Sequence, residues 1–421
     1  MSKVDKDFSL TSVPHTHRVG FLNMFVVMMG LTFFSASMWA GGSLGAGLSF
    51  RDLIISIILG NGILAAFAGA LAYIASKTGL STHLLAQYSF GRKGAYINSF
   101  MLAITQIGWF GVGVAMLAYP INLVTGIPVL PLIVVGGLLM ISTAYVGMKA
   151  LAILSAVAVP AIAILGGSSA TMAINDMGGF QALFAHVPQA GAALPISVAL
   201  TMTIGSFISA GTLTPDFTRF SKSPKHAISA TAIAFVIGNT LMFMFGAIGV
   251  IALGENDISN VMFSQGLIIP AIIVLTLNIW TTNDNALYAS GLALATIFNK
   301  PKKLMVLING IIGIVFANIL YNNFVSFLTI LGGVLPAIGA VIITDYFFVK
   351  KRNYAAFEKA EIKNFNIIAI IAWACGIIAS QTLPGIAPLN SLFVTGIIYF
   401  VGNKLSNKEV TVDTRDFVAG E

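Results

Sequence analysis

Charged side chains are scarce in this sequence of 421 residues, where Asp, Glu, Lys and Arg together make up 9%. Hydrophobic residues account for 57%, and the mean hydropathy is +0.92. Stretches such as 121–148 and 227–253 contain no acidic or basic side chain. A water-soluble protein needs a polar exterior, whereas about 20 apolar residues suffice to cross the hydrocarbon layer of a membrane. The shortage of charge therefore excludes a water-soluble protein and predicts a polytopic membrane protein.

Cysteine and clustered histidine are also lacking. The single cysteine, Cys375, lies in an apolar run, which excludes a disulfide framework and a cysteine metal site. The polar segment 1–18 has no apolar core before a small-residue cleavage site, so we expect no cleaved signal peptide. We expect the five histidines to be solvated, since they lie in tails, loops or loop edges without metal-ligand spacing: His15, His17, His83, His186 and His226.

The sequence also offers little that would support an enzyme. Residues 41–45 match the G-x-S-x-G pattern, but no strand precedes them and the segment is rich in glycine. We therefore expect no catalytic residues.

Apolar runs between polar breaks predict an all-α integral membrane protein with twelve spanning helices. We place them near 20–47, 53–76, 96–122, 128–147, 150–171, 194–214, 227–253, 262–290, 304–320, 323–348, 366–382 and 388–404. An even number of spans puts both termini on one side of the membrane.

The basic residues predict which side that is. Of the 22 Lys and Arg residues, only Arg51 falls on the side opposite the termini, where Asp52, Asp176, Glu255 and Asp257 also lie. Because basic residues concentrate in cytoplasmic loops, we expect cytoplasmic termini. The net charge of +7 is explained by basic residues placed at one face of a lipid bilayer. We therefore expect the bilayer as a partner and no binding to nucleic acid.

Two short internal similarities indicate an inverted repeat. Residues 30–37 resemble 204–211, and residues 105–109 resemble 276–280 at nearly the same offset. Each pair lies five spans apart, and an odd number of spans per unit inverts the second copy. We therefore predict a tail over 1–19, repeats over 20–171 and 194–348, two more helices over 366–404, and a second tail over 405–421.

Helix-weakening residues recur in the first span of each repeat. Residues 39–47 are rich in glycine, and Pro215 ends the corresponding segment 212–215. The simpler interpretation is close helix packing through small residues. Because the disruption recurs in both halves, we favour broken helices around a central site.

Span eight holds the most polar membrane segment. Asn278, Thr281, Thr282 and Asn285 share one helical face and offer neutral oxygens, which suit a cation of low charge. Interhelical hydrogen bonding is the simpler alternative. Asp284, an acidic residue deep in the span, is expected to be a substrate contact, a gating contact or a proton site.

Spans three and six offer a site for a flat ligand. Gln106 and Trp109 share a face, and Phe207 lies between Ser206 and Ser209. Two aromatic rings can sandwich a planar heteroaromatic compound while the amide and hydroxyls contact its edge. A tryptophan in a membrane protein often anchors at the interface instead, but Trp109 lies in mid-span.

Four segments resemble the nucleobase–cation symport family: 30–39, 105–113, 205–216 and, most specifically, 278–291. The resemblance implies a LeuT-type fold of five plus five inverted helices and two more. It also implies import of cytosine with sodium by alternating access. We expect a functional monomer in the bacterial cytoplasmic (inner) membrane. A proton-coupled permease is the alternative, because of Asp284, and a channel fits broken helices with a stacking pair less well.

The resemblance also implies two sets of site residues. Sodium would be held by the carbonyls of Gly30, Phe33 and Asn278 and the hydroxyls of Thr281 and Thr282, with Phe34 replacing Phe33 if the register differs by one. The substrate would be bound by Gln106, Trp109 and Phe207. Relatives that transport hydantoins have tryptophan at the span-six position, and the phenylalanine here suits a smaller ring. Ser206, Ser209, Asn278, Asp284 and Asn285 complete the predicted substrate site, with Asn283 as a competitor for the asparagine role.

Overall fold

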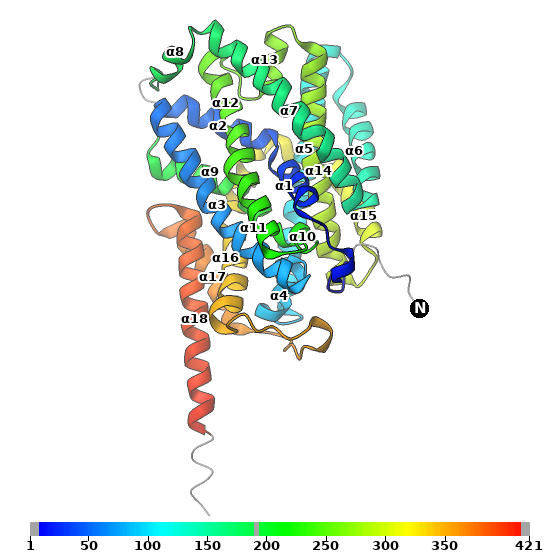
Figure 1. Ribbon diagram of the computed structural model, residues 1–421, viewed down its shortest axis with the longest axis vertical. Coiled ribbons are helices and arrows are strands. Elements are labelled where there is room, and N and C mark those ends of the chain that lie inside the picture. The colour runs from blue at the N-terminus through cyan, green and yellow to red at the C-terminus, as the bar shows by residue number, and fades with distance from the viewer. Residues whose placement is uncertain (1–7, 189–192, 414–421) are drawn as a thin grey trace, which may run out of the picture.

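The computed structural model describes residues 8–188 and 193–413. Within these ranges the secondary structure is helical, apart from an isolated parallel bridge between Val19 and Ser221. The helices form one bundle, from which the last helix, α18, projects (Figure 1). The expectation of an all-α chain is therefore confirmed.

The helices of the first half match the predicted spans to within a few residues. They are α1 (Phe21–Thr32), α2 (Ser35–Gly47), α3 (Phe50–Thr78), α4 (Thr82–Phe90), α5 (Gly94–Thr125), α6 (Val129–Val146), α7 (Met148–Asp176) and α8 (Phe180–Phe184). The short helices α4 and α8 were not expected, because nine and five residues are too short for a spanning signal.

The second half contains two π-helical segments. Its elements are α9 (Ile196–Thr212), α10 (Thr214–Thr218), α11 (Pro224–Ile233), the π-helix η2 (Ala234–Asn239), α12 (Thr240–Leu253), α13 (Ile258–Ser264), α14 (Ile268–Phe298), α15 (Lys302–Asn322), α16 (Phe324–Thr344) and the π-helix η3 (Asp345–Val349). Helices α17 (Ile367–Thr382) and α18 (Ala387–Asp413) follow. The eighth span was predicted to begin at 262, but Gly266, with a φ of 78°, separates α13 from α14.

Length and composition identify fewer spanning helices than the twelve predicted. Among the described residues, six helices are long and apolar enough to cross a membrane, or seven if the bent pair α1 and α2 counts as one. Helix α14 is outside this set, because its polar run lowers its hydropathy. The inverted repeat stays a prediction.

The first span is broken, but not by its glycines. Helices α1 and α2 meet at 54° around Phe33 and Phe34, whose backbones are extended. The glycine-rich stretch lies further on, inside α2. A Cβ on Gly41 would lie 2.0 Å from the carbonyl oxygen of Phe243, so these glycines allow α2 to pack closely on α12. In the second half, the single residue Leu213 separates α9 from α10.

Candidate substrate and cation site

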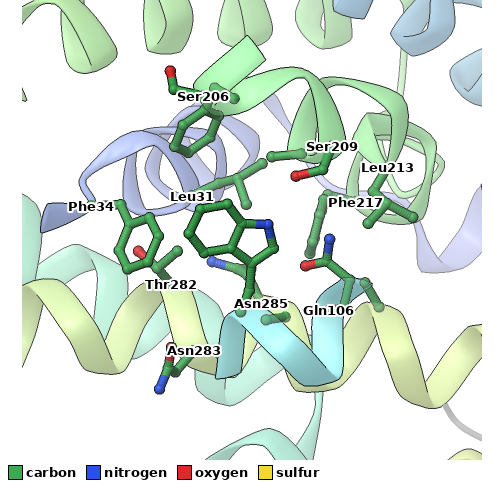
Figure 2. A pocket seen from close by; sticks show the side chains of 15 residues that line it. Leu31, Phe34, Gln106, Ser206, Ser209, Leu213, Phe217, Thr282, Asn283 and Asn285 are labelled. Carbon is green, nitrogen blue, oxygen red and sulfur yellow. The ribbon is translucent and has the colours of Figure 1, made fainter. Parts of the chain in front are cut away.

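A buried pocket lies beside the break in the first span (Figure 2). Its walls come from α1 and the break, α5, α9, α10 and α14. The lining includes Leu31, Phe34, Gln106, Trp109, Ser206, Phe207, Ser209, Phe217, Thr282, Asn283, Asn285 and Ala289. The structure therefore brings spans one, three, six and eight together around one space.

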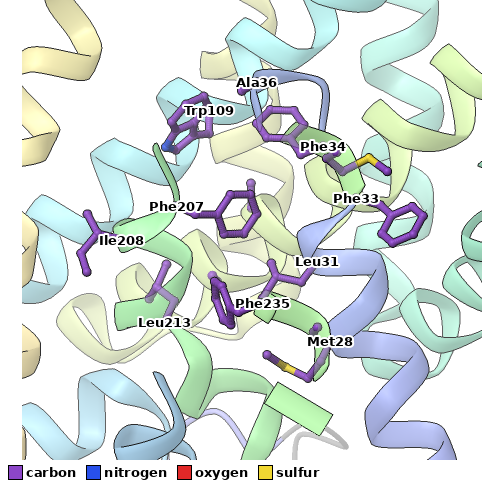
Figure 3. Close-up of a cluster of buried hydrophobic side chains, with 14 of the residues drawn as sticks. Met28, Leu31, Phe33, Phe34, Ala36, Trp109, Phe207, Ile208, Leu213 and Phe235 are labelled. Atoms are coloured by element: carbon purple, nitrogen blue, oxygen red, sulfur yellow. The ribbon is translucent and has the colours of Figure 1, made fainter. Parts of the chain in front are cut away.

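Aromatic rings from separate elements form the walls of the pocket. The rings of Phe34 and Trp109 meet edge to face, with centroids 5.5 Å apart and an interplanar angle of 75°. Phe207 packs edge to face on Phe235 of η2, at 5.7 Å. Figure 3 shows Trp109, Phe34 and Phe207 gathered on one side of the broken span. A flat ligand could therefore contact several ring faces.

The break itself explains why Phe34 reaches the pocket. In extended backbone, successive side chains point to opposite sides. Phe34 accordingly faces Trp109, whereas the neighbouring ring of Phe33 points away (Figure 3). Phe34 was expected only as a possible cation ligand, and Phe217 was not expected at all. Both look like ordinary core residues in the sequence, so no local signal could have identified them.

The pocket wall contains a donor and an acceptor that have no hydrogen-bond partner among the described residues. They are the Gln106 Nε2, which is a donor, and the Asn285 Oδ1, which is an acceptor. The orientation of the Asn285 amide is fixed, because its Nδ2 donates to the carbonyl oxygen of Thr281 at 2.8 Å. Buried polar groups normally have partners, so these two atoms are suited to a polar ligand.

The three competing asparagines occupy different environments. Asn285 and Asn283 line the pocket, but the Asn283 amide donates to the carbonyl oxygen of Phe110 at 3.1 Å. Asn278 is not part of the lining, and its Oδ1 accepts a hydrogen bond from the Ser35 hydroxyl at 3.1 Å. Asn285 is therefore the asparagine with a free acceptor at the pocket.

Asp284 does not line the pocket either. Its Oδ1 accepts a hydrogen bond from the Thr143 hydroxyl at 2.8 Å, and that hydroxyl also accepts from the Trp280 ring nitrogen at 2.8 Å. Thr143 belongs to α6, so the carboxyl group faces a neighbouring helix. The structure thus gives no support to direct contact between Asp284 and a ligand in the pocket.

Two acidic residues outside the pocket, Asp345 and Asp216, are also buried. Asp345 accepts a hydrogen bond from the Tyr399 hydroxyl at 2.7 Å. Asp216 accepts one from the backbone amide of Thr82 at 2.8 Å and lies 3.5 Å from the Nε2 of His83. His83 is itself fully buried, so the expectation that all five histidines are solvated is wrong. The reason is α4, which holds this histidine against α10.

Neutral oxygens gather where α1 ends. The Thr282 hydroxyl lies 2.9 Å from the carbonyl oxygen of Phe33 and 3.2 Å from that of Asn278. The Thr281 hydroxyl lies 3.0 Å from the same Asn278 oxygen. Gly30 lies about one turn earlier, where its Cβ would be 2.1 Å from the Ser155 hydroxyl of α7. These uncharged oxygens fit a monovalent cation such as sodium.

A helical bundle with a broken first span beside a buried pocket is typical of a membrane transporter. The chain matches, over residues 12–402, the family described as permeases for cytosine, purines, uracil, thiamine and allantoin. It is 51% identical over 407 residues to the cytosine permease of Escherichia coli strain K12, covering 97% of this chain and 96% of that one.

Solved structures agree on the fold. The closed conformation of Mhp1, a nucleobase-cation-symport-1 family transporter with bromovinylhydantoin bound, superposes with a TM-score of 0.84 at 18% identity, covering 95% of this chain and 96% of Mhp1. A Na+-coupled sialic acid symporter gives 0.73 at 14% identity, covering 93% and 90%. The fold is therefore LeuT-type, like that of Mhp1. The matching family model and the 51% identity to a cytosine permease show that the chain belongs to the cytosine/purine permease family.

Proposed function

We propose that this protein imports cytosine together with sodium by alternating access. The observation that carries the proposal is the pocket: aromatic walls, one unpartnered donor and one unpartnered acceptor lie directly beside a cluster of neutral oxygens. The 51% identity to a cytosine permease over nearly the full length supports the choice of base.

The polar pair in the pocket matches the edge of cytosine. Cytosine presents an exocyclic amine, a donor, next to an unprotonated ring nitrogen, an acceptor. The Asn285 Oδ1 would accept from the amine while the Gln106 Nε2 donates to the ring nitrogen. Uracil presents a carbonyl and a ring N–H in these places, and the fixed Asn285 amide would then face a carbonyl oxygen. An unpaired buried polar group costs about 1–3 kcal/mol, which disfavours uracil.

Stacking would supply affinity without choosing the base. The rings of Trp109 and Phe207 are predicted to enclose the base from two sides, and the Phe34 ring packs edge to face on Trp109. Stacking of one base on an aromatic side chain contributes about 1–3 kcal/mol and tolerates any flat ring.

The break in span one would link the two ligands. The Phe33 carbonyl oxygen belongs to the cation cluster, and the next residue, Phe34, lines the substrate pocket. Thr282 belongs to both sites. A sodium ion bound there would therefore fix the position of the Phe34 ring, and cytosine would stabilise the same arrangement. Such coupling is reciprocal, so each ligand should tighten the other by the same factor.

Sidedness and assembly complete the proposal. The distribution of basic residues supports twelve spans with both termini in the cytoplasm of a bacterium, whose inner membrane would hold the protein. The pocket is built within one chain, which supports a functional monomer.

A proton-coupled permease is the second candidate, and the buried carboxyl group of Asp284 is the observation that favours it. Uptake of radiolabelled cytosine into proteoliposomes under separately imposed sodium and proton gradients distinguishes the two. We expect accumulation with a sodium gradient at equal pH on both sides. Accumulation with a proton gradient in choline buffer, and none with sodium, would reject sodium coupling.

A further inference from the structure

Arg219 is fully buried at the end of α10, with its guanidinium group among backbone and side-chain acceptors. Its Nη1 donates to the carbonyl oxygen of Phe8 at 2.8 Å, and its Nη2 to the Tyr288 hydroxyl at 3.2 Å. Its Nε donates to the carbonyl oxygen of Asp216 at 3.2 Å. A planar guanidinium can hold three groups in a fixed geometry, so Arg219 joins the N-terminal segment, α10 and α14.

Two of these elements, α10 and α14, form part of the wall of the substrate pocket. Phe217, two residues before Arg219, lines the pocket and packs against the Tyr288 ring at 6.0 Å. Ala289, the residue after Tyr288, lines it too. The contacts of Arg219 therefore lie at the end of the pocket nearest to the N-terminal segment.

The N-terminal segment is held in place by a second set of contacts. The backbone amide of Val19 donates to the carbonyl oxygen of Phe220 at 2.7 Å, and the backbone amide of Lys222 donates to the carbonyl oxygen of Val19 at 2.9 Å. Two residues later the chain enters α1. Holding the N-terminal segment on α10 therefore also holds the start of α1.

A second cavity, of about 690 Å³, lies beside the N-terminal segment and the start of α1. Phe8 and Phe220, which flank the guanidinium group, both line it, as do Met24 and Val27 of α1. Helix α1 runs from this cavity to the substrate pocket, where Leu31 lies about one turn beyond Val27. Arg219 thus contacts or adjoins residues of both linings: Phe8 and Phe220 at the second cavity, and Phe217 at the substrate pocket.

We propose that Arg219 is a positioning residue that keeps the pocket closed on the side of the N-terminal segment. When its bonds to Phe8 and Tyr288 break, α10 and the start of α1 are free to separate from α14, and the pocket connects with the second cavity. The inference rests on the proposed alternating access, with the N-terminal side in the cytoplasm. It assigns no new contact to the substrate.

The test measures access to the pocket from each side of the membrane. Cys375→Ser removes the one native cysteine, and Ala289→Cys places a thiol in the pocket wall. A small, membrane-impermeant thiol reagent is then added to inside-out and to right-side-out vesicles. Arg219→Gln and the milder Tyr288→Phe are introduced separately, with Arg92→Gln, an exposed arginine on the same side, as the matched control.

We expect Arg219→Gln to raise labelling about threefold or more in inside-out vesicles and to lower it in right-side-out vesicles, because opening one side depopulates the other state. Tyr288→Phe should shift labelling in the same directions by less, and Arg92→Gln should not. Unchanged labelling in both variants would overturn the proposal. An equal rise from both sides would do so too, since it would mark a purely structural role. If Arg219→Gln fails to fold, Tyr288→Phe alone decides.

Labelling requires neither cytosine nor sodium. Unchanged labelling would therefore reject the role of Arg219 and would leave the proposed binding of cytosine and sodium unaffected. A failure of sodium-driven uptake would equally leave the labelling result valid.

Discussion

The contact between α2 and α12 predicts a strong effect of a single methyl group. A Cβ on Gly246 would lie 1.8 Å from the carbonyl oxygen of Met38, a distance below the 3.0 Å that real Cβ atoms keep. The two helices would have to separate by about 1.2 Å, which is 3.0 Å less 1.8 Å. Because the obstacle is backbone, no side-chain rotation can relieve it. Overpacking typically costs about 1–3 kcal/mol, and we expect Gly246→Ala to lie near the upper end.

Thermal unfolding in detergent measures this cost. At about 2 °C per kcal/mol for a long chain, we expect the melting temperature to fall by about 5 °C. The matched control is Gly62→Ala in α3, where nothing lies within 4 Å of the added Cβ. There alanine should be neutral or stabilise the helix by up to about 1 kcal/mol.

The substitution should also affect transport, because α2 begins directly after Phe33 and Phe34. A displaced α2 shifts the Phe33 carbonyl oxygen, so half-maximal cytosine uptake should need more sodium. If Gly246→Ala has the melting temperature and the sodium dependence of the wild type, α2 does not pack on α12 as described.

Four further substitutions test the two proposed sites. Thr282→Val removes a hydroxyl oxygen and should raise the sodium concentration for half-maximal uptake about tenfold, or about 1.4 kcal/mol, and an unchanged value would exclude this oxygen as a ligand. Trp109→Ala should weaken cytosine and its ring analogues together by about 1–3 kcal/mol in binding assays, whereas loss of cytosine alone would contradict a stacking role. Gln106→Glu should change the ranking of cytosine, isocytosine and uracil in competition uptake, and an unaltered ranking would place base choice elsewhere. Asp284→Asn should leave that ranking and the sodium dependence intact, since its carboxyl group faces Thr143, and loss of coupling would favour a proton mechanism.

Much of the architecture follows from the sequence because the membrane simplifies it. Hydrocarbon imposes a minimum length on apolar runs, so most helix bounds could be predicted from runs and breaks. The polar run around Thr281 and the pair Gln106 and Trp109 were identifiable because uncompensated polar groups in a span are costly. The short helices α4 and α8 were not predicted, because neither is long enough to give a span signal.

Which side chains meet was decided by the tertiary structure. Helical periodicity places Asn278 and Asn285 on one face, but only the packing of α5, α9 and α14 shows that Asn285 reaches the pocket while Asn278 contacts Ser35. The glycines of α2 predicted a break, whereas their backbone contacts with α12 show close packing. Arg219 looked like one more basic residue in a loop, yet it is buried. Spacing along one helix fixes the direction of a side chain, but the helix it meets depends on how distant segments pack together.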